Sequence, residues 1–142
     1  MKSYTDLEQS KKLAEILPIE SADMRYGYIA PYEFSDRLYD GGYDEVPYPK
    51  DFMKKNQNFS ENEYDGEIPC WSLSALLDIL DSELDGENGT TYQLHLYKAG
   101  TWWDITYDEV YDEACPIEVA AGEELVDVCV AMIIELHKLN MI

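Results

Sequence analysis

The sequence predicts an α+β fold in which an antiparallel sheet, built on a central β-hairpin, packs against three helices. Apolar side chains recur at helical spacing in three segments, at about residues 6–17, 72–82 and 123–139. A fourth segment, at about residues 91–107, alternates apolar and polar side chains on both sides of a glycine, which is typical of a hairpin. Helices and strands do not alternate along the chain, so we do not expect a parallel β/α fold.

The composition indicates a single domain spanning residues 1–142. A chain of this length that is 46% hydrophobic can bury a substantial core, which argues against intrinsic disorder. The net charge is −20 and is unevenly placed: residues 1–55 hold 11 acidic and 8 basic side chains, and residues 56–142 hold 19 acidic side chains and two lysines. This charge should repel nucleic acids and anionic membranes and attract basic proteins.

The first helix is predicted from its capping signal and its stop. Thr5 and Glu8 have the T-x-x-E spacing of a capping box. Pro18 ends the helix, because the residue before a proline avoids helical backbone angles. Residues 25–67 then form an irregular region rich in tyrosine and acidic residues. We expect one or two edge strands within long loops there, one of them in MRYGYIAPY with Tyr26 and Tyr28 on the same face.

The second helix begins at Ser72, a good N-cap residue, and Trp71 before it can pack onto Leu76. In the hairpin, we expect Ala99-Gly100 to be the two-residue turn, so that Tyr97 faces Trp102. That register gives one core face and one polar face. The core face would carry Tyr92, Leu94, Leu96, Trp103, Ile105 and Tyr107, and the polar face Gln93, His95, Tyr97, Trp102, Asp104 and Thr106. The segment EVYDEA, residues 109–114, is a candidate third strand.

The third helix is apolar almost all round, apart from one narrow polar stripe. Such a helix is either enclosed by the sheet and the other helices or contributes to a dimer interface. Cys129 lies within its apolar run and is expected in the core. The three cysteines are odd in number and have no C-x-x-C spacing, so we expect no disulfide framework. No leader and no membrane-spanning run is found, which favours a cytoplasmic protein.

Three stretches together resemble a group of small acidic proteins of phages and mobile elements of gut anaerobic bacteria, a group with no known activity. They are SYTDLEQSKKLAEILPIESADM, IPCWSLSALLDIL and CVAMIIELHKLNMI, which cover the two ends and the middle helix. The resemblance implies a small accessory protein of a mobile element, expressed in a bacterial cytoplasm. It supplies no catalytic or binding residues.

No motif predicts an enzyme, a cofactor or a strong metal site. Asp81, Glu83 and Asp85 match the first half of an EF-hand loop, but Tyr92 replaces the glutamate at its twelfth position, so these residues are weak calcium candidates and a solvated turn is the alternative. His95 opposite Asp104 could be an oriented base. Because no serine or cysteine lies beside the two, we interpret them as a cross-strand polar pair.

The expected function is therefore the binding of another protein. Aromatic side chains beside carboxylates suit an interface with a basic protein, and the candidate partner-binding residues are Tyr39, Asp40, Tyr43, Asp44, Glu45, Tyr97 and Trp102. In its sharpest form the protein mimics nucleic-acid charge and inhibits a basic nucleic-acid-binding factor, without contacting nucleic acid itself. The alternatives are a solvated loop at residues 31–49, loops that cover Tyr97 and Trp102, and a homodimeric scaffold or small-ligand module paired through the third helix.

Overall fold

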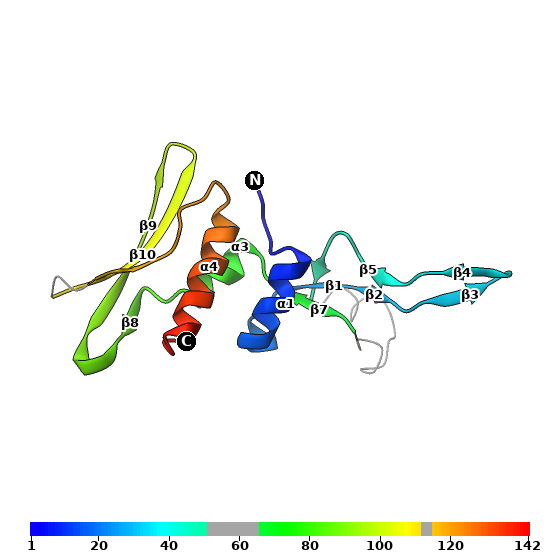
Figure 1. Cartoon of the computed structure of the whole chain (residues 1–142), viewed down its shortest axis with the longest axis horizontal. Coiled ribbons are helices and arrows are strands. Elements are labelled where there is room, and N and C mark those ends of the chain that lie inside the picture. The colour runs from blue at the N-terminus through cyan, green and yellow to red at the C-terminus, as the bar shows by residue number, and fades with distance from the viewer. Residues whose placement is uncertain (51–65, 112–114) are drawn as a thin grey trace. The chain divides into compact units, whose positions relative to one another are not determined.

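A computed structural model describes residues 1–50, 66–111 and 115–142 and confirms the α+β class (Figure 1). Its α-helices are α1 (Leu7–Ile16), α3 (Leu73–Ile79) and α4 (Leu125–Lys138). The chain falls into two compact units. We call Met1–Thr5 with Ser72–Ile142 the terminal unit and Asp6–Trp71 the inner unit. The single domain expected from the composition stays a prediction. Among the described residues, no helix has the length and hydrophobicity needed to cross a bilayer.

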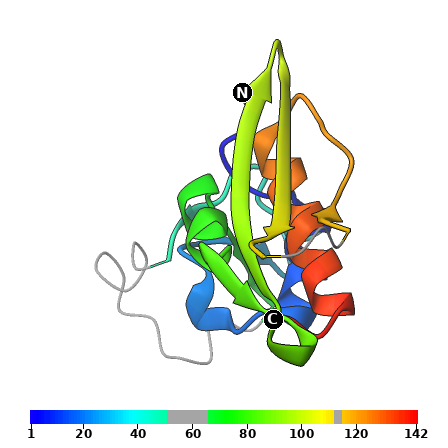
Figure 2. The same ribbon diagram turned by 90° about the vertical axis from the view of Figure 1, so that its left-hand side faces the viewer.

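The terminal unit is built on a four-stranded antiparallel sheet with the strand order β11-β10-β9-β8. Its strands are β8 (Glu83–Asp85), β9 (Thr91–Ala99), β10 (Trp102–Glu109) and β11 (Ile117–Glu118). The hairpin of β9 and β10 packs against α3, and α4 packs on β10 and α3. Figure 2 shows this unit with the sheet in front and α3 and α4 behind it. One face of the sheet is therefore covered by helices.

The predicted hairpin is present, but its turn is Gly100-Thr101 and not Ala99-Gly100. Trp102 pairs with Ala99, and Tyr97 pairs with Asp104, so the predicted pairing of Tyr97 with Trp102 is wrong. Gly100 has a φ of +63°, which glycine adopts at little cost, and the tightest turn forms around it. The correction moves each pairing by two residues, and an even shift leaves every side chain on its predicted face. Ile105 and Tyr107 are accordingly fully buried.

The edges of the sheet differ from the prediction. Of the candidate third strand EVYDEA, Glu109 is the end of β10, Val110 and Tyr111 belong to no strand, and residues 112–114 lie outside the described residues. The strand that pairs with the free side of β10 is β11, which begins at Ile117. On the other edge, β8 occupies the segment expected to be a solvated turn or a weak calcium loop. The second helix consequently ends at Ile79 rather than near residue 82, because the Ser82 carbonyl already accepts a bond from the amide of Leu94 as the chain enters β8.

The core of the terminal unit centres on α4. The buried residues of this helix are Leu125, Val126, Val128, Cys129, Val130, Met132, Ile133 and Leu136. This burial favours a helix enclosed by the sheet and the other helices, and the dimer interface through this helix stays a prediction. Cys129 is a fully buried free thiol, as predicted. At the start of α3, the Ser72 hydroxyl accepts a bond from the Ala75 amide, which confirms the predicted N-cap.

In the inner unit, α1 begins one residue later than its predicted capping box. The cap is Asp6, whose carboxylate accepts a bond from the Gln9 amide at 2.8 Å, while the Gln9 side chain accepts one from the Asp6 amide at 3.1 Å. Thr5 is fully buried and is not the cap. The aspartate competes successfully because its charge also favours the positive end of the helix dipole. Leu13 is fully buried on α1, which packs against β7 (Ile68–Cys70).

Between α1 and β7 the chain forms six short strands by residue 49, where we expected one or two. β1 (Met24–Tyr26) lies between β6 (Tyr48–Pro49) and β7 in a three-stranded antiparallel sheet. The 3₁₀ turn η1 (Ile19–Ser21) precedes β1, and its Ser21 hydroxyl accepts a bond from the Trp71 indole at 2.9 Å. Tyr26 is buried and Tyr28 is 40% exposed, so the two do not share a face; the chain leaves this sheet at Gly27.

The other four strands form a projecting ribbon, which we call the arm (residues 28–43). β2 (Tyr28–Ile29) pairs with β5 (Gly42–Tyr43), and β3 (Tyr32–Phe34) pairs with β4 (Arg37–Tyr39). Ser35 and Asp36 form the turn at its tip with φ values of 51° and 61°, the left-handed conformation of a type I′ turn. Figure 1 shows β3 and β4 extending beyond β2 and β5, away from α1.

We predict that Gly41→Ala loosens the arm and that Gly42→Ala does not. A Cβ at Gly41 would lie 2.0 Å from the carbonyl oxygen of Ile29, whereas one at Gly42 would meet nothing within 4 Å. Backbone atoms cannot yield as a flexible side chain can, so Gly41→Ala should cost about 1–3 kcal/mol of local stability. Amide hydrogen exchange across residues 28–43 measures this cost, and equal exchange in the two variants would contradict the described strand pairing.

We also predict that the protein loses stability above about pH 9. Burial raises the pKa of the Cys129 thiol to about 12 and, with the charge of Asp81, raises the pKa of Tyr107 well above its ordinary value. The unfolded chain then loses protons that the folded chain keeps, so stability is complete below the unfolded pKa values and falls as pH rises. Each group contributes a slope of at most about 1.4 kcal/mol per pH unit.

Urea unfolding at pH 8 to 11 tests this slope. Cys129→Ala and Tyr107→Phe should each make the dependence on pH shallower. Tyr111→Phe is the matched control for the loss of a tyrosine hydroxyl, because Tyr111 is 86% exposed. A stability that stays constant up to pH 11 would contradict the burial of the two groups.

Candidate protein-binding site

The face of the terminal sheet turned away from α4, which we call the outer face, gathers acidic side chains. The strand register aligns Glu83 with Gln93 and Asp108, and His95 with Thr106 and Glu118. Side chains paired in this way lie on the same face. The outer face carries Glu83, Asp85, Thr91, Gln93, His95, Tyr97, Ala99, Trp102, Asp104, Thr106, Asp108 and Glu118. Among these residues are five carboxylates and no lysine or arginine.

Two aromatic rings lie at the turn end of the outer face. Tyr97 is 52% exposed and Trp102 is 51% exposed, so both rings are accessible to a partner protein. The two residues are not cross-strand partners of each other. The Tyr97 hydroxyl donates a hydrogen bond of 2.7 Å to Asp104, which fixes the ring. This bond and the charge of Asp104 raise the pKa of Tyr97, because both favour the neutral phenol. A rigid, half-exposed ring beside carboxylates suits an interface.

His95 does not face Asp104 as predicted, because the hairpin register differs. It pairs with Thr106 and lies 3.5 Å from the carboxylate of Asp108, with both side chains about half exposed. No serine or cysteine belongs to the outer face. The arrangement remains a solvent-exposed polar pair and provides no activated nucleophile.

The weak calcium candidates lie in a strand rather than in a calcium-binding turn. Glu83 and Asp85 belong to β8, whose extended backbone pairs with β9, and Asp81 precedes it with its carbonyl accepting a bond from the Tyr107 hydroxyl. An EF-hand loop instead needs a compact turn that brings its ligands around one ion. Within residues 1–50, 66–111 and 115–142, no group of three or more histidines, cysteines or carboxylates is placed to hold a metal ion.

An open pocket of about 590 Å³ lies beside the end of β8 in the terminal unit. Asp85 and Glu87 supply carboxylates, Tyr92 supplies a ring, and Leu139 and Met141 supply apolar walls. Its volume falls within the range of about 300–1,000 Å³ typical of ligand pockets. The combination favours a cation on an apolar stem, as in a lysine or arginine side chain, because the carboxylates attract the charge and the walls cover the stem.

The remaining predicted residues lie in the inner unit, on or next to the arm. Tyr39 stacks on Tyr32, with ring centroids 4.8 Å apart and an angle of 9° between the planes. Tyr43 packs against Tyr28 at 5.0 Å, and the Lys11 ammonium lies 5.1 Å from the centre of the Tyr43 ring. Asp40, Asp44 and Glu45 are exposed. The predicted residues therefore form two sets on separate units: Tyr97 with Trp102, and the five residues beside the arm.

Sequence reasoning missed the apolar residues of the arm. Phe34 is 67% exposed and Leu38 is 74% exposed, and Ile29 and Tyr32 are more than half exposed. The available signal was the sequence YEFSDRLY, in which aromatic and apolar residues alternate with polar ones around Ser35-Asp36. A hairpin is usually recognised by Asn-Gly or Asp-Gly, and neither dipeptide occupies the turn at Ser35-Asp36; the Asp40-Gly41 of the arm lies after β4 instead.

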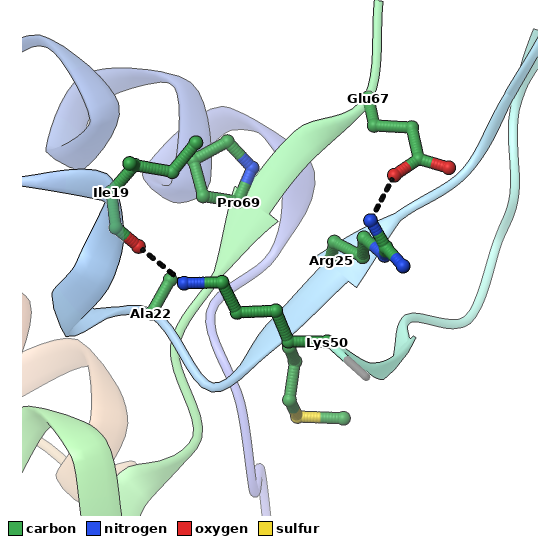
Figure 3. Close-up of a pocket in the computed structure, with 7 residues that line it drawn as sticks. Ile19, Ala22, Arg25, Lys50, Glu67 and Pro69 are labelled. Carbon is green, nitrogen blue, oxygen red and sulfur yellow. Dashed lines mark hydrogen bonds and ion pairs between the residues drawn. The ribbon is translucent and has the colours of Figure 1, made fainter. Parts of the chain in front are cut away.

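A smaller pocket in the inner unit, shown in Figure 3, belongs to the structure of the sheet. Arg25 on β1 forms an ion pair of 3.0 Å with Glu67, and Tyr48 on β6 donates its hydroxyl to the same carboxylate. Burial and this carboxylate strongly raise the pKa of Tyr48. The Lys50 ammonium donates to the Ile19 carbonyl across the pocket. With a volume of about 100 Å³, the pocket is smaller than ligand sites of about 300–1,000 Å³.

We predict that Asp104→Asn lowers the pKa of Tyr97 toward that of an ordinary tyrosine. The amide keeps a hydrogen-bond acceptor and removes the negative charge that favours the neutral phenol. The measurement is an NMR titration of the Tyr97 ring carbon, and Glu83→Gln, which removes a carboxylate from the far side of the same face, is the control. An unchanged Tyr97 titration in Asp104→Asn would contradict the described hydrogen bond.

Comparisons of the chain with protein-family models, with curated proteins and with solved structures each find no match. The resemblance to small acidic proteins of mobile elements stays a prediction.

Proposed function

We propose that the protein binds a basic protein through the outer face of the terminal sheet. The observation that carries the proposal is the strand register, which gathers five carboxylates and two half-exposed aromatic rings on one open face without lysine or arginine. No arrangement for catalysis competes with this function among the described residues of the outer face. The protein is therefore proposed to act by binding and not as an enzyme.

The carboxylates and the rings have different roles in such an interface. A single exposed ion pair contributes only about 0.2–1 kcal/mol, but the field of many like charges speeds and directs association with a positive surface. Tyr97 and Trp102 can supply the affinity, because aromatic anchors that become fully desolvated contribute about 2 kcal/mol or more each. The outer face has both parts, with the rings at one end and the charges along the strands.

The outer face also suits competition with a nucleic acid for the same basic surface. Alternate residues on a strand are about 6.6–6.8 Å apart and neighbouring strands about 4.7–4.9 Å apart, so the carboxylates form a regular charged array. This array is sparser than duplex DNA, which has about one charge per 1.7 Å of axis. The proposed mimicry therefore covers one patch of a binding groove rather than the length of a duplex. The pocket beside Asp85 and Glu87 would hold one basic side chain of the partner.

The proposal predicts salt-dependent binding that depends on the outer face. Proteins from nuclease-treated lysate are captured on the full chain, eluted in salt steps and identified, and the retained basic protein is purified. Its affinity is then measured at several salt concentrations. The variant Glu83→Gln with Glu118→Gln should make the affinity less dependent on salt, because two fewer charges take part.

The matched control is Glu15→Gln with Glu20→Gln, which removes the same charge from exposed positions of the inner unit. It should change the salt dependence less. Tyr97→Ala with Trp102→Ala should weaken binding at least about tenfold and leave the melting temperature nearly unchanged, since both rings are half exposed. Equal effects of the two charge variants, or a large loss of stability in the aromatic variant, would contradict the proposal.

A further inference from the structure

We propose that the arm is a second binding element, which inserts into an apolar groove of the partner protein whose rim is basic. This inference deepens the proposed function and rests on it, because it assumes the same basic partner. The arm lies in the inner unit, separate from the outer face, and its proposed contact is apolar insertion rather than charge attraction.

The arm exposes large apolar side chains on both of its faces. Phe34 and the stacked pair of Tyr32 and Tyr39 lie on one face, and Leu38 lies on the other, beside Glu33. The exposed fractions are 67% for Phe34, 74% for Leu38, 51% for Tyr32 and 39% for Tyr39. Single exposed apolar residues are ordinary on protein surfaces, but a contiguous group marks an interaction site. Contacts on both faces require a groove and not a flat surface.

The arm is shaped before it binds. The stack of Tyr32 on Tyr39 is nearly parallel, and Tyr28 packs against Tyr43 at the base, where Lys11 of α1 lies over the Tyr43 ring. The amide of Asp44 also donates to the carbonyl of Gly27, which closes the base of the ribbon. A preformed element loses less conformational entropy when it binds than a flexible loop does. Within residues 1–50, 66–111 and 115–142, moreover, no other strand pairs with β3 or β4, so the outer edges of this two-stranded ladder can bond to the walls of a groove.

The charge of the arm indicates which chemistry the groove of the partner protein must have. The carboxylates of the arm and the two residues after it are Glu33, Asp36, Asp40, Asp44 and Glu45, and the one cation there is Arg37. All of these side chains are exposed. A partner that covers Phe34 and Leu38 must place its own groups beside these carboxylates, and lysine and arginine give the complementary charge. Two copies of this chain would bring like charges together at the same contact, which disfavours a dimer through the arm.

The test uses the full chain with the photoreactive residue p-benzoylphenylalanine in place of Leu38, and, in a second preparation, in place of Trp102. Each is irradiated in cell lysate, and the cross-linked protein is identified by mass spectrometry and then purified. We expect position 38 to give one discrete adduct with a basic protein. Phe34→Ser with Leu38→Ser should weaken binding of that purified protein at least about tenfold, which corresponds to 1.4 kcal/mol, with an unchanged dependence on salt.

Two glycine variants separate a loss of contacts from a loss of folding. Gly41→Ala distorts the base of the arm and should weaken binding, whereas Gly42→Ala should bind as the unmodified chain does. An adduct with a second copy, an adduct within the chain, or full affinity of the serine variant overturns the inference. If position 38 gives no adduct and position 102 does, the arm has no such role and the proposed function stands. If neither position gives one, both are overturned.

Discussion

The alternation of side chains across β9 and β10 is the constraint on which the terminal unit depends. Ile105 and Tyr107 are fully buried on the face covered by α4, and a shift of the pairing by one residue would turn them to solvent. Burial of this face therefore fixes the register, and the register in turn fixes which residues reach the other face. The acidic and aromatic outer face is a geometric consequence of the same alternation that builds the core.

Much of this arrangement could be predicted from the sequence, because the faces of a hairpin depend on whether residue numbers are odd or even. The turn was misplaced, yet an even displacement leaves every face unchanged, and so Tyr97 and Trp102 were correctly assigned to the polar side. The cap of α1 was missed by one residue, since Thr5 and Asp6 are both good N-cap residues and only the three-dimensional contacts distinguish them.

The arm could not be predicted in the same way. Its strands have two or three residues each, too few for a two-residue period to be recognised, and its turn of Ser35-Asp36 lacks the glycine that normally marks a hairpin. Its apolar side chains are exposed in the folded chain, so they do not follow the pattern that burial in a core imposes. The exposed apolar side chains also distinguish the arm from an ordinary connecting loop, whose surface residues are not expected to bind an apolar partner.

The absence of lysine and arginine from the outer face is the strongest argument that its charge has a use. Solubility of a small domain needs a net charge of only about 2–8, and the chain carries −20. Glu118 on β11 lies diagonal to Asp104 and Asp108 on β10, where like charges repel, and a lysine at position 118 would replace that repulsion with favourable cross-strand pairs. A face kept for structure alone would gain stability from such a residue. On a face that binds a positively charged surface, the same lysine would weaken the electrostatic attraction. The five carboxylates of the outer face are the arrangement that such binding would favour.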